Sequence, residues 1–218
     1  MMSDNPDRPL VVLAALSALT IVAMLATALS AGIAQEVFQA ARLAEPNAAR
    51  LLLNPPGLRL NVGLDNLFIV LYAAYFVLLT VRMKDVLPPT HRFVALSALM
   101  LTALLDAVEN HHILAMLFSA EQNLPLSTAE SQVQMAASFV KFQVSYVGVA
   151  LFAFGFLRLG GMGRLLAWGV WLVYVPTGML IYMLPPEATK PLVLLRATCF
   201  IAAFVLSVVI FRRPMKAG

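Results

Sequence analysis

Long apolar stretches dominate this sequence, and the first of them most constrains the fold. From Pro9 to Gln35 no residue carries a charge. A helix of about 20 residues crosses a hydrocarbon core of roughly 30 Å, so this stretch is long enough to span a membrane. Over the whole chain 61% of the residues are hydrophobic and 12% are charged, about half the charged fraction of an ordinary soluble domain. This composition excludes a disordered chain, a collagen-like repeat and most soluble enzyme folds.

The first apolar stretch has a second interpretation, as a secretory signal, because Gly32-Ile33-Ala34 resembles a small-x-small cleavage site. The stretch is long for the hydrophobic region of a signal, and two nearby aspartates oppose the positive charge of Arg8. We therefore expect it to remain in the chain as an uncleaved anchor.

Six membrane spans are expected in all, separated by charged or proline-rich segments. They cover residues 9–34, 61–81, 93–118, 131–157, 165–184 and 191–211. The predicted fold class is therefore all-α, a polytopic integral membrane bundle of six transmembrane helices that forms a single domain over residues 1–218. The connection 35–60 is expected outside the cytoplasm. It is interpreted as a packed connector, with a short interfacial helix from Val37 to Leu43 as the alternative.

The distribution of basic residues indicates how the spans are oriented. With six spans, both termini share one side of the membrane with the loops after the second and fourth spans. That side holds Arg8, Arg82, Lys84, Arg92, Arg158, Arg164, Arg212, Arg213 and Lys216, whereas the opposite loops hold Arg42, Arg50, Arg59 and Lys190. Basic residues favour the cytoplasmic side, so both termini are predicted to be cytoplasmic. The predicted location is a cell membrane, crossed several times, of the bacterial inner-membrane type.

Ionisable residues are costly inside a membrane, yet six fall within the expected spans. They are Asp65, Asp106, Glu109, His112, Lys141 and Arg196. At about 1.5 Å per residue, Asp106 and Glu109 lie roughly 18 and 13 Å below the outer end of the third span. Lys141 lies about 15 Å below the outer start of the fourth span. Opposite charges are thus expected at one level on two neighbouring helices.

Helical spacing gathers polar residues on one face of three spans. Asp106, Glu109 and Asn110 follow one another at i, i+3 and i+4, with His112 at the edge of the same face. The corresponding stripes are Gln134, Ser138, Lys141, Ser145 and Gly148 on the fourth span and Asn61, Asp65, Tyr72 and Phe76 on the second. Matching polar faces predict an interior polar pocket that opens toward the outside.

The charges within the spans do not balance. Three carboxyl groups oppose Lys141 and Arg196, so one carboxyl must hold a proton, or His112 or a bound cation must supply the missing positive charge. A carboxyl that holds a proton beside an ion pair can act as a proton carrier or a general acid. The plainer interpretation is that these groups only fasten the helices together through hydrogen bonds.

These arguments define the candidate site. Asp106, Glu109 and Lys141 are the candidate catalytic residues, with either carboxyl as proton donor and the ammonium tuning it. The candidate binding residues are Asp65, Asn110, His112, Gln134, Ser145, Tyr146, Arg196 and Tyr72.

The sequence assigns no metal and no cofactor. Glu109 and His112 have the Glu-x-x-His spacing of di-iron carboxylate bundles, but those sites need two such motifs. A mononuclear site with Asp106, and an axial haem ligand at His111 or His112, are the alternatives. The chain has one cysteine, Cys199, so it forms neither an internal disulfide nor a cysteine metal site.

Three hypotheses of function remain. The first is a protein that binds or transports a small solute or amphiphile, with ion coupling at the charged residues. The second is an intramembrane enzyme, an isomerase, cyclase or hydrolase, that uses acid/base catalysis on a lipid-like substrate. The third is a non-catalytic subunit of a membrane complex. The expected partners are the lipid bilayer, a small-molecule or lipid-like ligand and, because no inverted repeat is visible, a second copy of the chain. Nucleic acid is excluded, since the net charge of +4 reflects orientation in the membrane.

Overall fold

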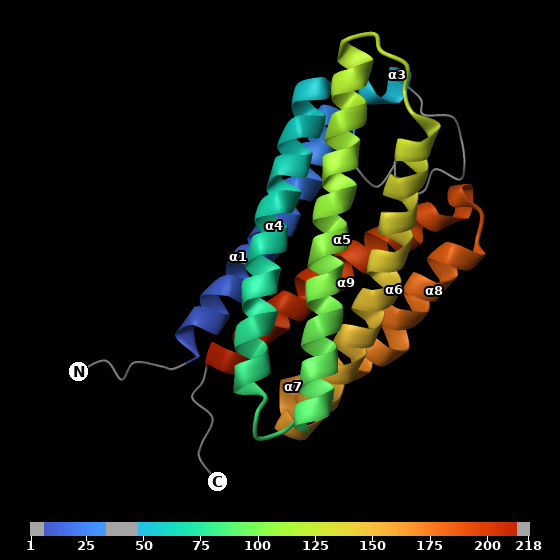
Figure 1. Cartoon of the computed structure of the whole chain (residues 1–218). Helices are drawn as coiled ribbons and strands as arrows, with labels where there is room; N and C mark the ends of the chain where they lie inside the picture. Colours follow the sequence, from blue (N-terminus) through green and yellow to red (C-terminus); the bar gives the residue numbers. More distant parts are fainter. Residues whose placement is uncertain (1–6, 34–47, 213–218) are drawn as a thin grey trace. The chain divides into compact units, whose positions relative to one another are not determined.

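The computed structural model describes residues 7–33 and 48–212, and all regular secondary structure in them is helical. Figure 1 follows the helices along the chain, from α1 in blue to α9 in red. They are α1 (Arg8–Ala31), α3 (Ala48–Leu51), α4 (Pro55–Arg82), α5 (Pro89–Glu121), α6 (Thr128–Leu159), α7 (Gly161–Gly169), the π-helical segment η1 (Val170–Tyr174), α8 (Val175–Met183) and α9 (Pro186–Arg212).

Six helical segments of the described residues are long and apolar enough to cross a membrane, with α7, η1 and α8 together forming the fifth. They differ in length, from 23 residues in the fifth to 33 in α5. Large apolar side chains are exposed along them, for example Leu29 at 86%, Phe93 at 72% and Met183 at 76%. Such side chains are favourably placed against lipid, whereas in water they would form large exposed apolar patches. The prediction of a six-span, all-α, multi-pass membrane protein is confirmed.

The helices begin earlier than the apolar stretches suggested, and prolines explain most of the difference. The second, third and sixth spans were expected to begin after the proline pairs, whereas α4, α5 and α9 begin at Pro55, Pro89 and Pro186. Proline suits the first position of a helix, because its φ angle is already helical and its missing N–H has no partner there in any case. These prolines therefore start helices as well as ending the connections before them.

Part of the connection 35–60 lies outside the described residues, including the segment Val37 to Leu43 for which an interfacial helix was an alternative. The described remainder is largely helical where it was expected to be a loop. The helix α3 is a single turn, and a link of three residues, 52–54, separates its end from the start of α4. Asn54 joins this link to α1, because its Nδ2 donates a hydrogen bond to the carbonyl oxygen of Ala31 at 3.1 Å.

The fifth span is irregular near its middle. The turn Val170–Tyr174 is π-helical and is followed by α8, whose second residue is Pro176. Proline lacks the N–H that would close the preceding α-helical turn, and wide turns of this kind accommodate such an interruption. The indole Nε1 of Trp171 donates a hydrogen bond to the backbone oxygen of Ala150 on α6, at 3.2 Å. Trp171 is therefore fixed to a neighbouring helix, whereas Trp168 is 46% exposed.

The chain divides into two compact units, each of which takes part of α1, α4, α5 and α6. Among the described residues, the first unit comprises 7–19, 71–100 and 144–212, and the second comprises 20–33, 48–70 and 101–143. They are described separately below.

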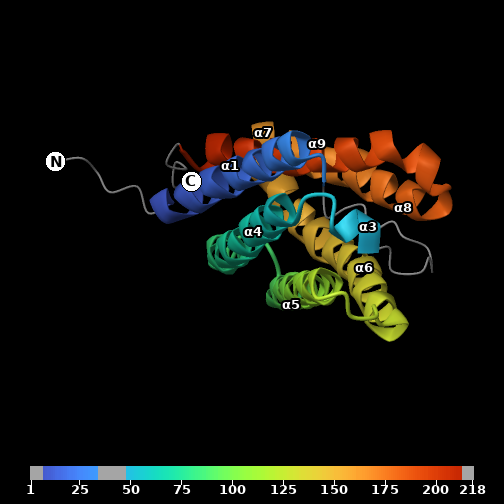
Figure 2. The ribbon, with the colours of Figure 1, turned by 90° about the horizontal axis from the view of Figure 1, so that it is seen from above.

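In the first unit, α9 packs against α7, η1 and α8, and Figure 2 shows α8 and α9 running side by side. The hydroxyl of Tyr75 on α4 donates a hydrogen bond to Ser207 on α9 at 2.8 Å. Close to the start of α1, Asp7 pairs with Arg82 at the end of α4, with Nε and Oδ1 2.7 Å apart. Polar contacts thus connect α4 to the last span and to the residue that precedes α1.

The second unit has an apolar core at the expected outer ends of its helices. The core residues are Ile33, Leu51, Leu58, Val62, Ile113, Met116, Leu117 and Ala120. Asn61 joins α4 to α1, since its Nδ2 donates to the backbone oxygen of Met24 at 3.0 Å. Asp65 lies one turn after Val62 on α4, and Glu109 and Asp106 lie one and two turns before Ile113 on α5.

Candidate functional site

Lys141 of α6 lies between two carboxyl groups of α5. Its Nζ forms an ion pair with Asp106 Oδ1 and lies 2.8 Å from Glu109 Oε2. The side chains of Lys141 and Glu109 are 4% and 0% exposed. Asp106 and Glu109 are three residues apart and therefore share a helical face, which lets one ammonium group reach both.

The contact forms close to the middle of both helices. At about 1.5 Å per residue, Asp106 lies roughly 22 Å from the end of α5, and Lys141 lies roughly 20 Å from the start of α6. The two depths agree, as the sequence indicated. Both distances are greater than the sequence predicted, because α5 ends later and α6 begins earlier than their apolar stretches do.

Asn110, the residue after Glu109, extends the charged group to α4. Its Nδ2 donates hydrogen bonds to Asp65 Oδ2 at 2.7 Å and to Asn66 Oδ1 at 2.9 Å. The carboxylate of Asp65 also interacts electrostatically with Lys141. Asp65, Asp106, Glu109, Asn110 and Lys141 thus form one buried group, here named the Lys141 cluster.

Three residues around the cluster were not anticipated from the sequence. The hydroxyl of Thr102 donates to the backbone oxygen of Lys141 at 3.3 Å, and the ring centroid of Phe142 lies 5.0 Å from Lys141 Nζ. Thr102 precedes Asp106 by four residues, so helical spacing could have identified it. Asn66 lies off the stripe that contains Asp65, and no spacing rule indicated that Asn110 would reach both.

His112 contacts a residue outside the cluster. Its Nδ1 lies 3.2 Å from Oε1 of Glu130, in the first turn of α6, and both side chains are partly exposed. Within residues 7–33 and 48–212, no three His, Cys, Asp or Glu side chains are grouped closely enough to hold a metal ion. The mononuclear alternative that joined His112 to Glu109 and Asp106 is therefore not formed.

The other candidate residues lie elsewhere. Gln134 is buried in the second unit, where its Nε2 donates to Ser138 Oγ at 3.0 Å, one turn along the same helix. The remaining four belong to the first unit: Tyr72, Ser145, Tyr146 and Arg196. All four are buried, and the guanidinium of Arg196 interacts electrostatically with the hydroxyl of Tyr146.

The buried charges within the spans retain the imbalance that the sequence showed. Asp65, Asp106 and Glu109 are buried acids, and Lys141 and Arg196 are buried bases, with the three acids and Lys141 in one unit. Burial penalises every uncompensated charge, so the charges of the second unit depend on one another. No protein-family model, curated protein or solved structure matches the chain.

Proposed function

We propose that this membrane protein binds or transports a small solute or amphiphile and couples that event to a proton at the Lys141 cluster. The observation that carries the proposal is the burial of Asp106 and Glu109 against one shared ammonium group. In a medium of low dielectric constant, a proton that enters or leaves such a group changes its charge at a large energetic cost or gain. The affinity for a solute bound beside it would change with that charge.

The position of His112 supports exchange of this proton. His112 follows Glu109 by three residues on α5, so it lies nearer to the C-terminal end of that helix. It contacts Glu130 in the first turn of α6. Imidazole and carboxyl groups both carry protons near neutral pH or below it. The two partly exposed side chains are therefore suited to pass a proton between the aqueous phase and Glu109.

Proton movement across vesicles that contain the purified protein tests the proposal. The vesicles enclose a pH-sensitive dye, and a potassium gradient with valinomycin makes the interior negative. Neutral amino acids, whose zwitterions cross lipid very slowly unaided, are then added outside one at a time. We expect at least one of these solutes to start acidification of the interior.

Two matched variants locate the effect. Glu109→Gln removes the buried carboxyl and should abolish solute-dependent acidification. Glu121→Gln makes the same chemical change on the same helix, in an exposed pair with Arg59, and should retain it. The proposal fails if no solute moves protons, or if both variants behave like the unmodified protein. The second result would leave the cluster with a structural role.

A further inference from the structure

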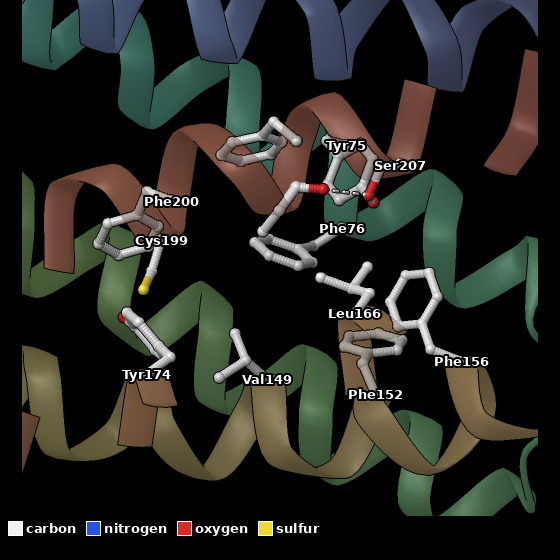
Figure 3. Close-up of a pocket in the computed structure, with 12 residues that line it drawn as sticks. Tyr75, Phe76, Val149, Phe152, Phe156, Leu166, Tyr174, Cys199, Phe200 and Ser207 are labelled. Carbon is white, nitrogen blue, oxygen red and sulfur yellow. Dashed lines mark hydrogen bonds between the residues drawn. The ribbon is translucent and has the colours of Figure 1, made fainter. Parts of the chain in front are cut away.

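Two cavities of the first unit differ in chemical character. The cavity beside Tyr174 has a volume of about 60 Å³ and is surrounded mainly by aromatic rings (Figure 3). The hydroxyl groups of Tyr75 and Ser207 in its wall are joined to each other by a hydrogen bond. The other cavity is a half-open groove of about 270 Å³ between the start of α1 and the end of α4, here named the α1–α4 groove. Charged and apolar side chains both line it, so it can bind a molecule that has a charged part and an apolar part.

The apolar and charged parts of the groove follow one another along α4. Leu78 and Val81 line the groove and are 36% and 63% exposed. Arg82, Lys84 and Asp85 line it next, where the helix ends. Leu78, Val81 and Arg82 are spaced at i, i+3 and i+4, so they share one face of the helix. The lining therefore changes from apolar to charged toward the end of α4.

The length of α4 places this change at the surface of the membrane. At about 1.5 Å per residue, its 28 residues extend roughly 42 Å, about 12 Å more than a hydrocarbon core of about 30 Å. With the surplus shared between the two ends, Arg82 lies roughly 6 Å outside the core and Leu78 lies at its edge. Helical side chains tilt toward the N-terminus of their helix, so Leu78 and Val81 are directed toward the acyl chains. The groove thus lies where the headgroup and the first carbons of a phospholipid lie.

The charges that line the groove are balanced, but two of them are not paired within the protein. Asp7 pairs with Arg82, whose guanidinium also lies 6.0 Å from the ring centroid of Phe211. Lys84 and Asp85 are exposed, and within residues 7–33 and 48–212 neither forms an ion pair. A headgroup with a net charge gains little from a neutral lining. A headgroup with one positive and one negative group complements Asp85 and Lys84 together.

Hydrogen bonding distinguishes between the headgroups that carry both charges. A phosphate accepts hydrogen bonds from an ammonium or a guanidinium group, as Lys84 and Arg82 provide. The primary ammonium of ethanolamine has three N–H donors for the carboxylate of Asp85, whereas the quaternary ammonium of choline has none. The groove is larger than the roughly 150 Å³ that accepts a benzene ring, and phosphoethanolamine is only a little larger than benzene. Phosphoethanolamine therefore matches the groove in charge, hydrogen bonding and size.

We propose that the α1–α4 groove binds the phosphoethanolamine headgroup of a phospholipid. Lys84 and Arg82 hold the phosphate, and Asp85 accepts a hydrogen bond from the ammonium group. Leu78 and Val81 contact the start of the acyl chains. The site lies in the first unit and does not depend on proton coupling at the Lys141 cluster.

Native mass spectrometry of the purified full-length protein in detergent tests the proposal. The palmitoyl-oleoyl forms of phosphatidylethanolamine, phosphatidylcholine and phosphatidylglycerol are added as an equimolar mixture. They differ in mass, so the occupancy of each is measured separately. We expect phosphatidylethanolamine to form the first lipid complex at lower concentrations than the other two. The proposal is overturned if phosphatidylcholine or phosphatidylglycerol binds as tightly.

Asp85→Ala removes the acceptor at an exposed position. We expect it to weaken the binding of phosphatidylethanolamine roughly three- to tenfold, the effect of one hydrogen bond. The lining then carries a net positive charge, so the binding of phosphatidylglycerol should strengthen. An undiminished preference for phosphatidylethanolamine over phosphatidylcholine would contradict the proposal.

Lys84→Gln removes the cation that faces the phosphate. Because phosphatidylethanolamine and phosphatidylcholine both contain this phosphate, we expect Lys84→Gln to weaken the binding of both by a similar factor. Lys190→Gln makes the same change at an exposed position near the start of α9 and should behave like the unmodified protein. Equal binding of phosphatidylethanolamine by the two variants would overturn the proposal.

Discussion

Lys141 is stable inside the protein because its neighbours compensate its charge. Removing an ammonium or a carboxylate from water costs several kcal/mol, and the attraction between them offsets this cost only when geometry and hydrogen bonding are good. Lys141 contacts two carboxyl groups, and Asn110 donates to a third. Each member of the cluster therefore depends on the others, and losing one exposes the rest to the full cost of burial.

Lys141→Met should consequently destabilise the protein strongly, by about 3–5 kcal/mol, because it leaves Asp106 and Glu109 buried without their ammonium partner. Combining it with Asp106→Asn removes one of the stranded charges and should restore part of the loss. The midpoint of unfolding and the yield of folded protein in detergent measure both effects. A double variant no more stable than Lys141→Met would show that direct pairing is the wrong explanation. Arg59→Met, which breaks an exposed pair with Glu121, serves as the control.

Gly178 is a position where a single methyl group has no room. A Cβ atom there would overlap the hydroxyl group and ring of Tyr146, so Gly178→Ala must displace that ring. We expect a loss of about 1–3 kcal/mol, the usual cost of overpacking, measured by thermal unfolding. Gly169→Ala is the matched control in the same span, because a Cβ atom meets nothing within 4 Å there. Alanine has a higher helix propensity than glycine, so Gly169→Ala should leave the free energy of unfolding unchanged or raise it. Equal losses in both variants would contradict the steric explanation.

At the scale of elements, the span count, the matching depth of opposite charges and the pairing of α5 with α6 could be predicted from the sequence. They follow from apolar length and helical spacing, which are local properties. The early starts of α4 and α5 were missed because Pro55 and Pro89 were interpreted as breaks. The contact of His112 with Glu130, the π-helical turn and the cavity beside Tyr174 depend on side-chain packing between distant segments, which spacing does not encode.

The irregular fifth span should depend on the bond from Trp171 to α6. Trp171→Phe keeps an aromatic ring but removes the donor to the Ala150 carbonyl, so we expect a loss of about 1 kcal/mol. Trp168→Phe changes the same side chain at an exposed position and should have little effect. Thermal unfolding of the two purified variants checks the difference, and a larger loss from Trp168→Phe would refute this account.

For the whole molecule, the asymmetry of basic residues predicts the orientation in the membrane. The connection from Glu121 to Thr128 has no Lys or Arg, whereas the connection between α4 and α5 contains Lys84 and lies next to Arg82 and Arg92. Lys and Arg in short connections favour the cytoplasmic side. The first connection should then face outward, and the termini should lie in the cytoplasm.

Labelling of single cysteines in a Cys199→Ala background tests this orientation. Gln122 and Asp85 are exposed in the two connections, and neither contributes a basic charge. A membrane-impermeant thiol reagent should label Gln122→Cys in intact cells, and should label Asp85→Cys only after the membrane is opened. The reverse pattern would place the termini on the other side.

The unequal lengths of the helices make the protein sensitive to the thickness of its membrane. At about 1.5 Å per residue, α5 is roughly 50 Å long and α1 roughly 36 Å, against a hydrocarbon core of about 30 Å. A thicker bilayer can be accommodated by the surplus length of α5, whereas α1 has only about one turn to spare. Hydrophobic mismatch therefore falls first on the short spans, α1 and the 23-residue segment Gly161–Met183, and a change of bilayer composition can strain these spans while α5 remains matched.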